Sequence, residues 1–303
     1  MIEASWLENP TTPFLYTAVF LASLFAYPGA SSFFAPTLYR GSEPIAFVAG
    51  FPRRIRLFGR ELQVMVAALL TVAREYKSSG YGILVWSELV RRAREAGLNG
   101  VVNYCIEGEA MDRMIVGGCR RLDVPVSRVC TASYLSRVLL RRRSEGGDAS
   151  SEISAAEFAE IASTVTAEVP LARRWSLAEA EWQCRRPGIV SVSQNGSGPG
   201  QGVLTGYVMP LANPSRTRCL VIEDVLWGNT EPDGREVLVQ ELVGNAAAAG
   251  AQVAIVPDLG YADLSPFTAA KFRPSGRRIH AYLSLFDDAL PAGELPGYYL
   301  DVF

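Results

Sequence analysis

A short glycine-containing loop, residues 77–82, is the segment of this sequence best suited to binding chemistry. It reads KSSGYG. Gly80 and Gly82 let the backbone come close to a ligand, and Lys77, Ser78 and Ser79 supply a cation and hydroxyl donors. A helical pattern follows, and the first amides of a helix, at the positive end of its dipole, attract anions. The loop, including Tyr81, therefore predicts a pyrophosphate site. It lacks the spacing of a P-loop and the full GxGxxG, so a flexible connection is the alternative.

Other residue types narrow the choice of chemistry. His280 is the single histidine, so a histidine-ligated metal centre cannot be assembled and we predict no metal. The five cysteines form no CxxC pair, and their odd number favours reduced thiols in a cytoplasmic protein. Cys105 or Cys130 as an acyl-carrying nucleophile is an alternative that lacks a histidine nearby in sequence.

The elements around the loop follow a simple order. Residues 44–58 and 62–72 are apolar runs separated by Gly59 and Arg60, which predicts two antiparallel strands joined by a hairpin. Residues 82–96 have helical apolar spacing, and an apolar strand follows at 100–104. The order strand, loop, helix, strand predicts an α/β unit.

The second part of the chain repeats this order, with strand 219–227, helix 236–249 and strand 252–256. Glu88, Ala93 and Gly97 recur 153 residues later as Glu241, Ala246 and Gly250. We therefore predict two related halves, 1–142 and 172–303, joined by the connection 143–171.

The loop itself is not repeated. In the second half Asp233 and Arg235 stand where the first half has its glycines, and the carboxylates of this segment would repel an anion. We expect only the first half to bind the nucleotide.

Residues 72–97 resemble motif A of the GNAT acetyltransferase superfamily, with Lys77 at the first position of its loop. A longer, colinear set of stretches resembles eukaryotic N-myristoyltransferases: FAYPGASSFF, PIAFVAGFPRRIRLFG, VAREYKSSGYG, GLNGVVNY, VLTGYVMPLANPS, AQVAIVPDL and AAKFRPSGRRIHAYL. The resemblance implies an α/β (α+β) fold of two tandem GNAT-like halves with mixed, mostly antiparallel central sheets. Acyl-CoA would bind the N-terminal half and the acceptor the C-terminal half.

The resemblance also implies roles for individual residues. The backbone amides of Leu69 and Leu70 would form the oxyanion hole, and Thr71 and Val72 would lie beside the CoA. The base would be the carboxylate of Phe303 at the chain end, with an ordinary surface terminus as the alternative.

Further candidates lie on neighbouring strands. Asn103 and Tyr104 are expected to orient the amine or the thiolate, and Asp258, His280 and Tyr282 to contact the acceptor, with a structural role as the alternative for His280. Asp258 or Asp301 is an alternative base. Residues 275–278 replace an acidic turn of the family with arginines, which favours an acidic or neutral acceptor.

The predicted function is therefore acyl-CoA-dependent N-acylation of a peptide or small-molecule amine, including lipidation of a natural-product peptide, by direct attack on the thioester. An acyl carrier protein could replace CoA as donor. The competing class is a noncatalytic acyl-CoA or peptide-binding module. A medium or long acyl chain is expected, because apolar residues near the N-terminus could line a channel or else form plain core: Phe14, Leu15, Phe20, Leu24, Phe25, Phe33 and Phe34.

Composition excludes several partners. The net charge of −2 and the absence of aromatic interleaving argue against nucleic acid, and the run at 141–143 is expected to be a solvated helix end. The apolar stretch 14–26 is shorter than the ~20 residues of a membrane-spanning helix. We expect a monomer.

Overall fold

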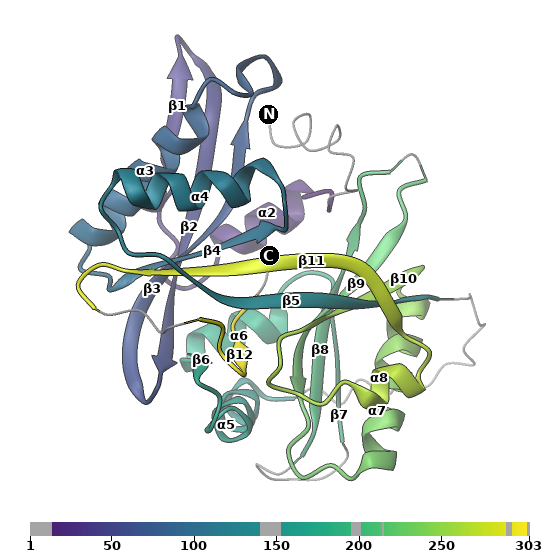
Figure 1. The fold of residues 1–303 in the computed structure, drawn as a ribbon. Helices are drawn as coiled ribbons and strands as arrows, with labels where there is room; N and C mark the ends of the chain where they lie inside the picture. Colours follow the sequence, from purple (N-terminus) through teal and green to yellow (C-terminus); the bar gives the residue numbers. More distant parts are fainter. Residues whose placement is uncertain (1–13, 140–152, 195–200, 214, 289–292, 302–303) are drawn as a thin grey trace.

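A continuous, twisted sheet of twelve strands forms the frame of the computed structural model, which describes residues 14–139, 153–194, 201–213, 215–288 and 293–301 (Figure 1). Along the sheet the strands follow the order β12-β6-β2-β3-β4-β11-β5-β10-β9-β8-β7, and β1 pairs with β2. Most neighbouring strands are antiparallel, and the parallel pairs are β3–β4, β9–β10 and β6–β12. The predicted mixed, mostly antiparallel sheet is confirmed.

The elements of the first part of the chain lie close to their predicted bounds. The hairpin and the helix after the loop are both present, and each predicted end is within a few residues of the observed one. The elements are α2 (Ala18–Phe25), β1 (Thr37–Arg40), β2 (Glu43–Leu57), β3 (Arg60–Val72), α3 (Tyr81–Glu95), β4 (Gly100–Ile106), α4 (Ala110–Arg121) and β5 (Ser127–Val138), with single 3-10 turns at Ser32–Phe34 and Arg74–Tyr76.

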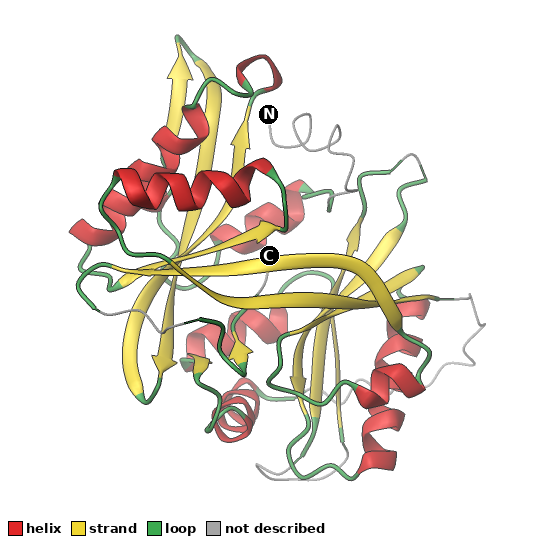
Figure 2. Cartoon of the chain, in the orientation of Figure 1, coloured by secondary structure: helices red, strands yellow, loops and turns green. Residues whose placement is uncertain are grey.

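The later elements confirm the repeated strand, helix, strand order. They are α5 (Ala155–Val165), β6 (Leu171–Arg174), α6 (Leu177–Arg185), β7 (Ile189–Ser193), β8 (Val203–Pro210), β9 (Arg218–Leu226), α7 (Pro232–Ala248), β10 (Val253–Asp258), α8 (Ser265–Ala269), β11 (Arg273–Leu285) and β12 (Tyr298–Tyr299). Helices cover the faces of the sheet, as the red and yellow segments of Figure 2 show.

Local sequence explains why these elements begin and turn where they do. Phe58 and Gly59 both have positive φ, 47° and 83°, as the two central residues of a type I′ hairpin turn require. The helices α5 and α6 each begin with a capping box, in which a serine hydroxyl and a glutamate three residues later bond each other's backbone amides.

Two long strands join the halves. β11 is hydrogen-bonded to β4 on one side and to β5 on the other, and β5 continues to β10. In Figure 1 these two strands run side by side across the middle of the molecule. β5, which precedes the 143–171 connection, thus pairs with β10 of the second half. β11, which lies near the end of the sequence, pairs with β4 of the first half. The halves of the sheet therefore exchange strands.

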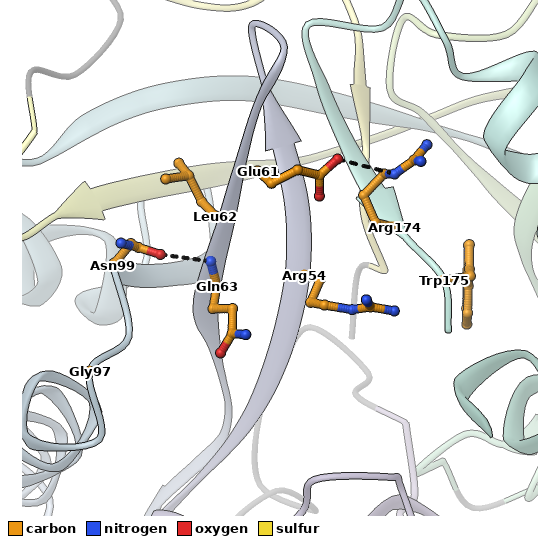
Figure 3. Close-up of a pocket in the computed structure, with 8 residues that line it drawn as sticks. All are labelled: Arg54, Glu61, Leu62, Gln63, Gly97, Asn99, Arg174 and Trp175. Carbon is orange, nitrogen blue, oxygen red and sulfur yellow. Dashed lines mark hydrogen bonds and ion pairs between the residues drawn. The ribbon is translucent and has the colours of Figure 1, made fainter. Parts of the chain in front are cut away.

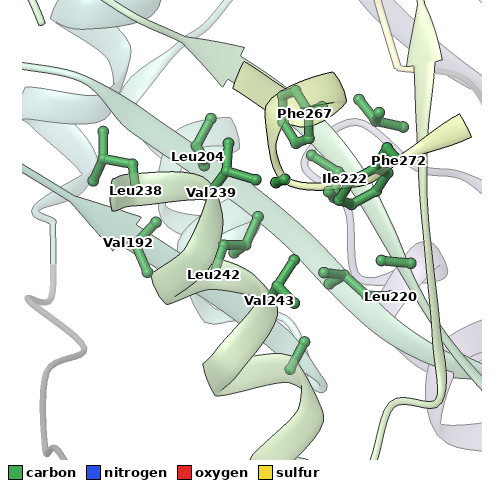
Figure 4. Close-up of a cluster of buried hydrophobic side chains, with 14 of the residues drawn as sticks. Val192, Leu204, Leu220, Ile222, Leu238, Val239, Leu242, Val243, Phe267 and Phe272 are labelled. Carbon is green, nitrogen blue, oxygen red and sulfur yellow. The ribbon is translucent and has the colours of Figure 1, made fainter. Parts of the chain in front are cut away.

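The core is divided among several layers. Between α7, α8 and the second-half strands, buried side chains such as Leu242 and Phe272 interdigitate (Figure 4). A second layer packs α3 and α4 on the first-half strands around Trp86. A third lies between the halves, where Phe20 and Leu24 of α2 meet Leu69 and Tyr207.

Candidate functional site

The glycine loop connects the end of β3 to the start of α3. Gly80, with φ of 85°, is the residue before the helix, and Ser78 also has positive φ, 72°. No side chain caps this helix start. The Ser79 hydroxyl donates to the Tyr76 carbonyl at 2.6 Å and accepts the Tyr81 amide at 3.3 Å. The amide of Tyr81 is thus bonded inside the loop, and the amides of Ile83 and Leu84 donate to the Gly80 carbonyl, so the phosphate role of the loop stays a prediction.

The second glycine of the loop packs against the strand that precedes it. A Cβ on Gly82 would lie 3.3 Å from Val72 and 3.7 Å from the sulfur of Met114 on α4. The glycine thus lets α3, α4 and the end of β3 converge. Val72 and Lys77, both predicted to contact the CoA, are the last residue of β3 and a residue inside the connection to α3.

One residue in β3 breaks the regular ladder just before the loop. Phe47 pairs with Thr71 and Ala49 with Ala68, so Leu69 and Leu70 together face Val48 alone. Such a β-bulge interrupts the hydrogen-bond ladder and bends the strand. Leu69 and Leu70, the predicted oxyanion donors, are therefore the two residues of the bulge.

The backbone at the bulge is unusual. Leu69 has φ of 59°, a conformation that leucine rarely adopts, although its side chain is buried between the halves. The Thr71 hydroxyl donates to the Leu69 carbonyl at 2.9 Å. Strained non-glycine residues of this kind cluster at binding and catalytic sites.

The strands beside the bulge diverge. β3 and β4 pair in parallel from Val64–Gly100 to Ala67–Asn103, and β4 then continues against β11 alone. Asn103 is buried, and its side-chain oxygen accepts the indole N–H of Trp86 on α3 at 2.8 Å. Its Nδ2 is buried without a partner in the described part of the chain. Asn103 thus lies where the two strands separate.

Tyr104 faces the opposite side of β4 and meets the end of the chain. Its hydroxyl is hydrogen-bonded to that of Tyr298, and burial together with the nearby Asp301 carboxylate raises its pKa well above the ordinary value. Residues 298–301 are thus packed beside Tyr104 of β4, one of the two residues predicted to orient the amine or the thiolate. Phe303, the predicted base, lies outside the described residues.

Asp301 is held by two buried arginines. Arg53 of β2 donates to its carboxylate at 2.6 Å and Arg173 of β6 at 2.9 Å. Burial raises the pKa of Asp301, but the two guanidinium groups outweigh it and bring the pKa to about 2. An ionised carboxylate so strongly paired is a poor proton acceptor, which argues against Asp301 as the alternative base. We call these three residues the arginine clamp.

His280 and Tyr282 belong to a buried polar group at the start of α4. Nδ1 of His280 is 3.0 Å from Asp112 Oδ1, and the Tyr282 hydroxyl donates to the same oxygen at 2.7 Å. Nε2 of His280 is 3.4 Å from Glu107. Burial raises the pKa of Asp112, but the hydrogen bonds from His280 and Tyr282 bring it below its usual range. A role for His280 and Tyr282 at the acceptor stays a prediction.

Asp258, the other predicted acceptor contact, is exposed at the last position of β10. Its carboxylate accepts the backbone amide of Gly260 at 3.2 Å, and so it shapes the turn after the strand. The structure does not bring it into hydrogen-bond contact with the other candidates.

The expected acyl-channel residues separate into two groups. Phe20 and Leu24 are buried between the halves, with Phe14 packed against them, whereas Phe25 and Phe33 are about 40% exposed. Only the first group lies beside Leu69. Plain core, the alternative, describes its packing equally well.

Comparison with known proteins begins with sequence. No family model matches the chain, and no curated protein matches it. Among solved structures, N-myristoyltransferase of Saccharomyces cerevisiae with bound myristoyl-CoA has a TM-score of 0.74, 13% identity, and covers 93% of this chain and 78% of its own. The fold is that of N-myristoyltransferase.

Two more structures place this fold in a wider group. The yeast N-myristoyltransferase with myristoyl-CoA and inhibitors has a TM-score of 0.71 and 14% identity, over 94% of this chain and 75% of its own. A GCN5-related N-acetyltransferase from Anabaena variabilis has a TM-score of 0.52 and 10% identity, over 93% and 68%. The predicted resemblance to N-myristoyltransferase and GNAT folds is confirmed.

The second half of this N-myristoyltransferase fold contains its own bulge. Thr205 pairs with Asp224 and Gly206 with Ile222, so Glu223 is the extra residue of β9. β9 and β10 separate just before it, after Val221 and Ile255, as β3 and β4 do in the first half.

Polar and aromatic side chains of the protein itself occupy this second bulge. Glu223 is paired with the buried Arg186. Asp224 accepts hydrogen bonds from Thr205, Gln183 and Tyr299. The amide of Val225, the residue after Asp224, donates to the Tyr261 hydroxyl at 3.0 Å. The helix α7 begins at Pro232 with no glycine loop before it.

The cysteines are mostly buried. Burial raises the pKa of Cys105 and Cys130 to about 12, which keeps both thiols protonated at neutral pH. In the described part of the chain no group of three or more His, Cys, Asp or Glu side chains could hold a metal ion. No helix over those residues is long and apolar enough to cross a membrane.

Sequence reasoning missed the arginine clamp and Asp112. A signal for Arg53 was present, because it occupies the face of β2 that Phe51 and Ile55 make apolar, and a buried arginine needs a partner. The identity of that partner, 248 residues away, could not be read from the pattern.

Proposed function

We propose that this protein is an acyl-CoA-dependent N-acyltransferase that binds its donor in the first half. The observation that carries the proposal is the β-bulge at Leu69 and Leu70, which directly precedes the glycine loop and lies where β3 and β4 separate. If the thioester of an acyl-CoA lay between these strands, backbone amides would face its carbonyl oxygen. The start of α3 would then face the phosphates of the CoA. The likeness to N-myristoyltransferase and to an N-acetyltransferase supports the same chemistry.

The donor site follows from this arrangement. Residues 77–82 hold the pyrophosphate, with Gly80 and Gly82 close to it and Lys77 supplying a charge. Thr71 and Val72 border the chain between the phosphates and the thioester. The second half does not bind a second donor, because the groups at its own bulge are already bonded to Arg186, Gln183 and Tyr261.

The chemical step is a direct displacement. A neutral amine attacks the thioester carbonyl, the amides of Leu69 and Leu70 stabilise the resulting oxyanion, and the carbon–sulfur bond breaks to release the CoA thiolate. The proton of the attacking amine passes to the Phe303 carboxylate. No acyl-enzyme forms, which agrees with the protonated state of the buried thiols.

The acceptor is a peptide or small-molecule amine that is neutral or acidic. Burial raises the pKa values of Tyr16 and Tyr134, and the positive charge of Arg277 opposes this rise at both tyrosines, so Arg277 is close enough to act on them electrostatically. Tyr16 stacks near Phe20 at the layer between the halves. A cation in this position attracts a carboxylate more readily than an ammonium group.

The test of the function is a survey of donors. Acyl-CoAs of graded chain length, and one acylated carrier protein, are incubated with a panel of amines and peptides while free thiol and product mass are followed. Release of one thiol for each acylated amine supports the proposal. Tight binding of acyl-CoA with no product from any acceptor would instead identify a noncatalytic acyl-CoA-binding module.

The base is tested by moving the carboxylate. One glycine added after Phe303 displaces the chain end by about 3.5 Å and leaves the arginine clamp intact. We expect the rate of the chemical step to fall by about 10²-fold or more, with acyl-CoA affinity unchanged. An unchanged rate would exclude the Phe303 carboxylate.

A further inference from the structure

A second, separate cavity lies at the opposite end of β3 from the glycine loop. It has a volume of about 740 Å³ and is bordered by β2, the start of β3, the turn after α3 and the end of β6 (Figure 3). Gln63 in this cavity lies six positions before Leu69 in β3, which corresponds to roughly 20 Å along a strand. We call it the Trp175 groove.

The tryptophan of the groove is held in one orientation. The guanidinium carbon of Arg173 lies 3.4 Å from the centre of its ring, and Phe158 packs edge-on at 5.1 Å. The indole N–H of Trp175 donates to the Tyr299 hydroxyl at 3.0 Å. A ring fixed by three neighbours can stack a ligand without losing rotamer entropy when it binds.

The arginine that faces this ring is only weakly engaged. In Figure 3 the guanidinium of Arg54 extends toward Trp175 across the groove. Its ion pair is with Glu179 at 3.6 Å, its side chain is 47% exposed, and it donates no hydrogen bond to the described residues. The pair is long, and the buried Glu179 is also bonded by Tyr27 and Ser176, so Arg54 can turn to a ligand while that carboxylate keeps other partners.

A second arginine and two amides complete the groove. Arg174 is bonded to Ser163 at 2.7 Å and is 3.4 Å from Glu61. The side-chain oxygen of Asn99 accepts a hydrogen bond from the backbone N–H of Gln63 at 2.8 Å. The side-chain N–H₂ group of Asn99 can therefore donate to a ligand. Two arginines, Arg54 and Arg174, and one glutamate, Glu61, line the groove, so its lining carries an excess of positive charge.

We propose that the Trp175 groove binds a small ligand that carries an oxyanion beside a flat ring. The ring stacks on Trp175, the oxyanion pairs with Arg54 and Arg174, and the amides of Asn99 and Gln63 bond a polar edge. The volume suits a ligand of this size. The site is distinct from the proposed acyl-CoA site and does not depend on the acyl-transfer activity.

Calorimetric titration of the full chain tests the proposal. Adenosine monophosphate and indole-3-acetate represent a nucleotide and an aromatic carboxylate, and adenosine and inorganic phosphate each supply one feature alone. We expect at least one of the first two to bind at one site, about tenfold or more tighter than adenosine or phosphate. The preferred probe distinguishes the two sources of the same chemistry.

Variants locate the binding. Arg54→Gln, at a half-exposed side chain whose buried partner Glu179 keeps its bonds to Tyr27 and Ser176, should weaken the better probe about tenfold, and Arg174→Gln should act in the same direction. Arg216→Gln, an exposed arginine outside the groove, is the matched control and should leave affinity unchanged. Trp175→Phe keeps an aromatic ring and should weaken binding less than Trp175→Ala.

Three results would overturn the proposal. The first is no binding of either ring-bearing anion at millimolar concentration. The second is binding that Arg54→Gln and Arg174→Gln both leave unchanged. The third is displacement of the bound probe by CoA, which would assign the binding to the glycine loop. None of these results would bear on acyl transfer, which is measured separately.

Discussion

At the proposed donor site, the side chains of Leu69 and Leu70 do not indicate that their backbone amides could bind an oxyanion. Leu69 and Leu70 belong to an apolar strand and match its pattern, so composition gives no sign that they form a bulge. Their assignment came from family resemblance, and the positive φ of Leu69 gives it a physical basis. Gly80 and Gly82, by contrast, could be selected from the sequence, and glycine suits both positions: Gly80 has φ of 85°, and a Cβ on Gly82 would lie 3.3 Å from Val72.

Gly80→Asp tests the phosphate site. The new carboxylate would face the pyrophosphate at the start of α3, and the left-handed φ of 85° would strain any side chain. We expect acyl-CoA affinity to fall by about 10²-fold or more in calorimetry. Gly293→Asp, at a similar φ of 83° with open space around it, is the control for strain. Equal affinity in the two variants would remove the phosphate role.

The buried thiols provide a second test. Because burial raises the pKa of Cys105 to about 12, its thiolate is scarce at neutral pH. We expect Cys105→Ser and Cys130→Ser to transfer acyl groups at rates within about threefold of the unaltered protein, and mass spectrometry to detect no acyl-enzyme. Loss of activity in either variant together with a trapped thioester would establish covalent catalysis instead.

Elements show where the sequence was informative and where it was not. Apolar runs flanking Gly59 and Arg60 predicted the β2–β3 hairpin, and helical apolar spacing predicted α3, each within a few residues, because each depends on local contacts. The contacts that join distant elements, such as Arg53 of β2 with Asp301, depend on which side chains meet after folding. Burial of Arg53 was detectable from its strand face, but its partner was not.

Asp301→Asn tests the arginine clamp. The variant leaves two buried guanidinium groups without a counter-charge, and we expect the free energy of unfolding at pH 7 to fall by about 3–5 kcal/mol in urea titrations. Asp288→Asn, in a more exposed pair with Arg60, should change it by less than about 1 kcal/mol.

The same clamp has a defined pH dependence. The pKa of Asp301 in the folded protein is about 2, below the ordinary value of 3.8, so the stabilisation is complete above pH 4. It is lost as pH falls through 2, when the carboxyl becomes protonated. The stability difference between the unaltered protein and Asp301→Asn should therefore shrink between pH 4 and pH 2. A constant difference would contradict the pairing.

The whole molecule combines two similar halves that have diverged at matching positions. Both have a bulge where two parallel strands separate, at Leu69 in one and Glu223 in the other. The repeat in sequence predicted the strand, helix, strand order of both parts, which the structure contains. It did not predict the exchange of β5 and β11 between them, because strand order is set by long-range pairing that local patterns do not record.

The difference between the halves predicts the number of donor sites. Calorimetry with acyl-CoA should give one site per chain. Tyr261→Phe removes the hydroxyl that bonds the Val225 amide and should leave that number unchanged, because the second half has no glycine loop. A second site of comparable affinity in the unaltered protein would mean that both halves bind the nucleotide.

Replacement of Leu70 by its α-hydroxy acid decides whether the bulge performs acyl transfer. The resulting ester keeps the side chain and removes one backbone N–H from the proposed oxyanion hole. With the best acyl-CoA and amine pair, we expect single-turnover thiol release to slow by about 10²–10³-fold while the affinity for acyl-CoA stays unchanged. Equal rates in the two proteins would contradict the assignment of Leu70, and no thiol release from the unaltered protein would contradict the enzyme.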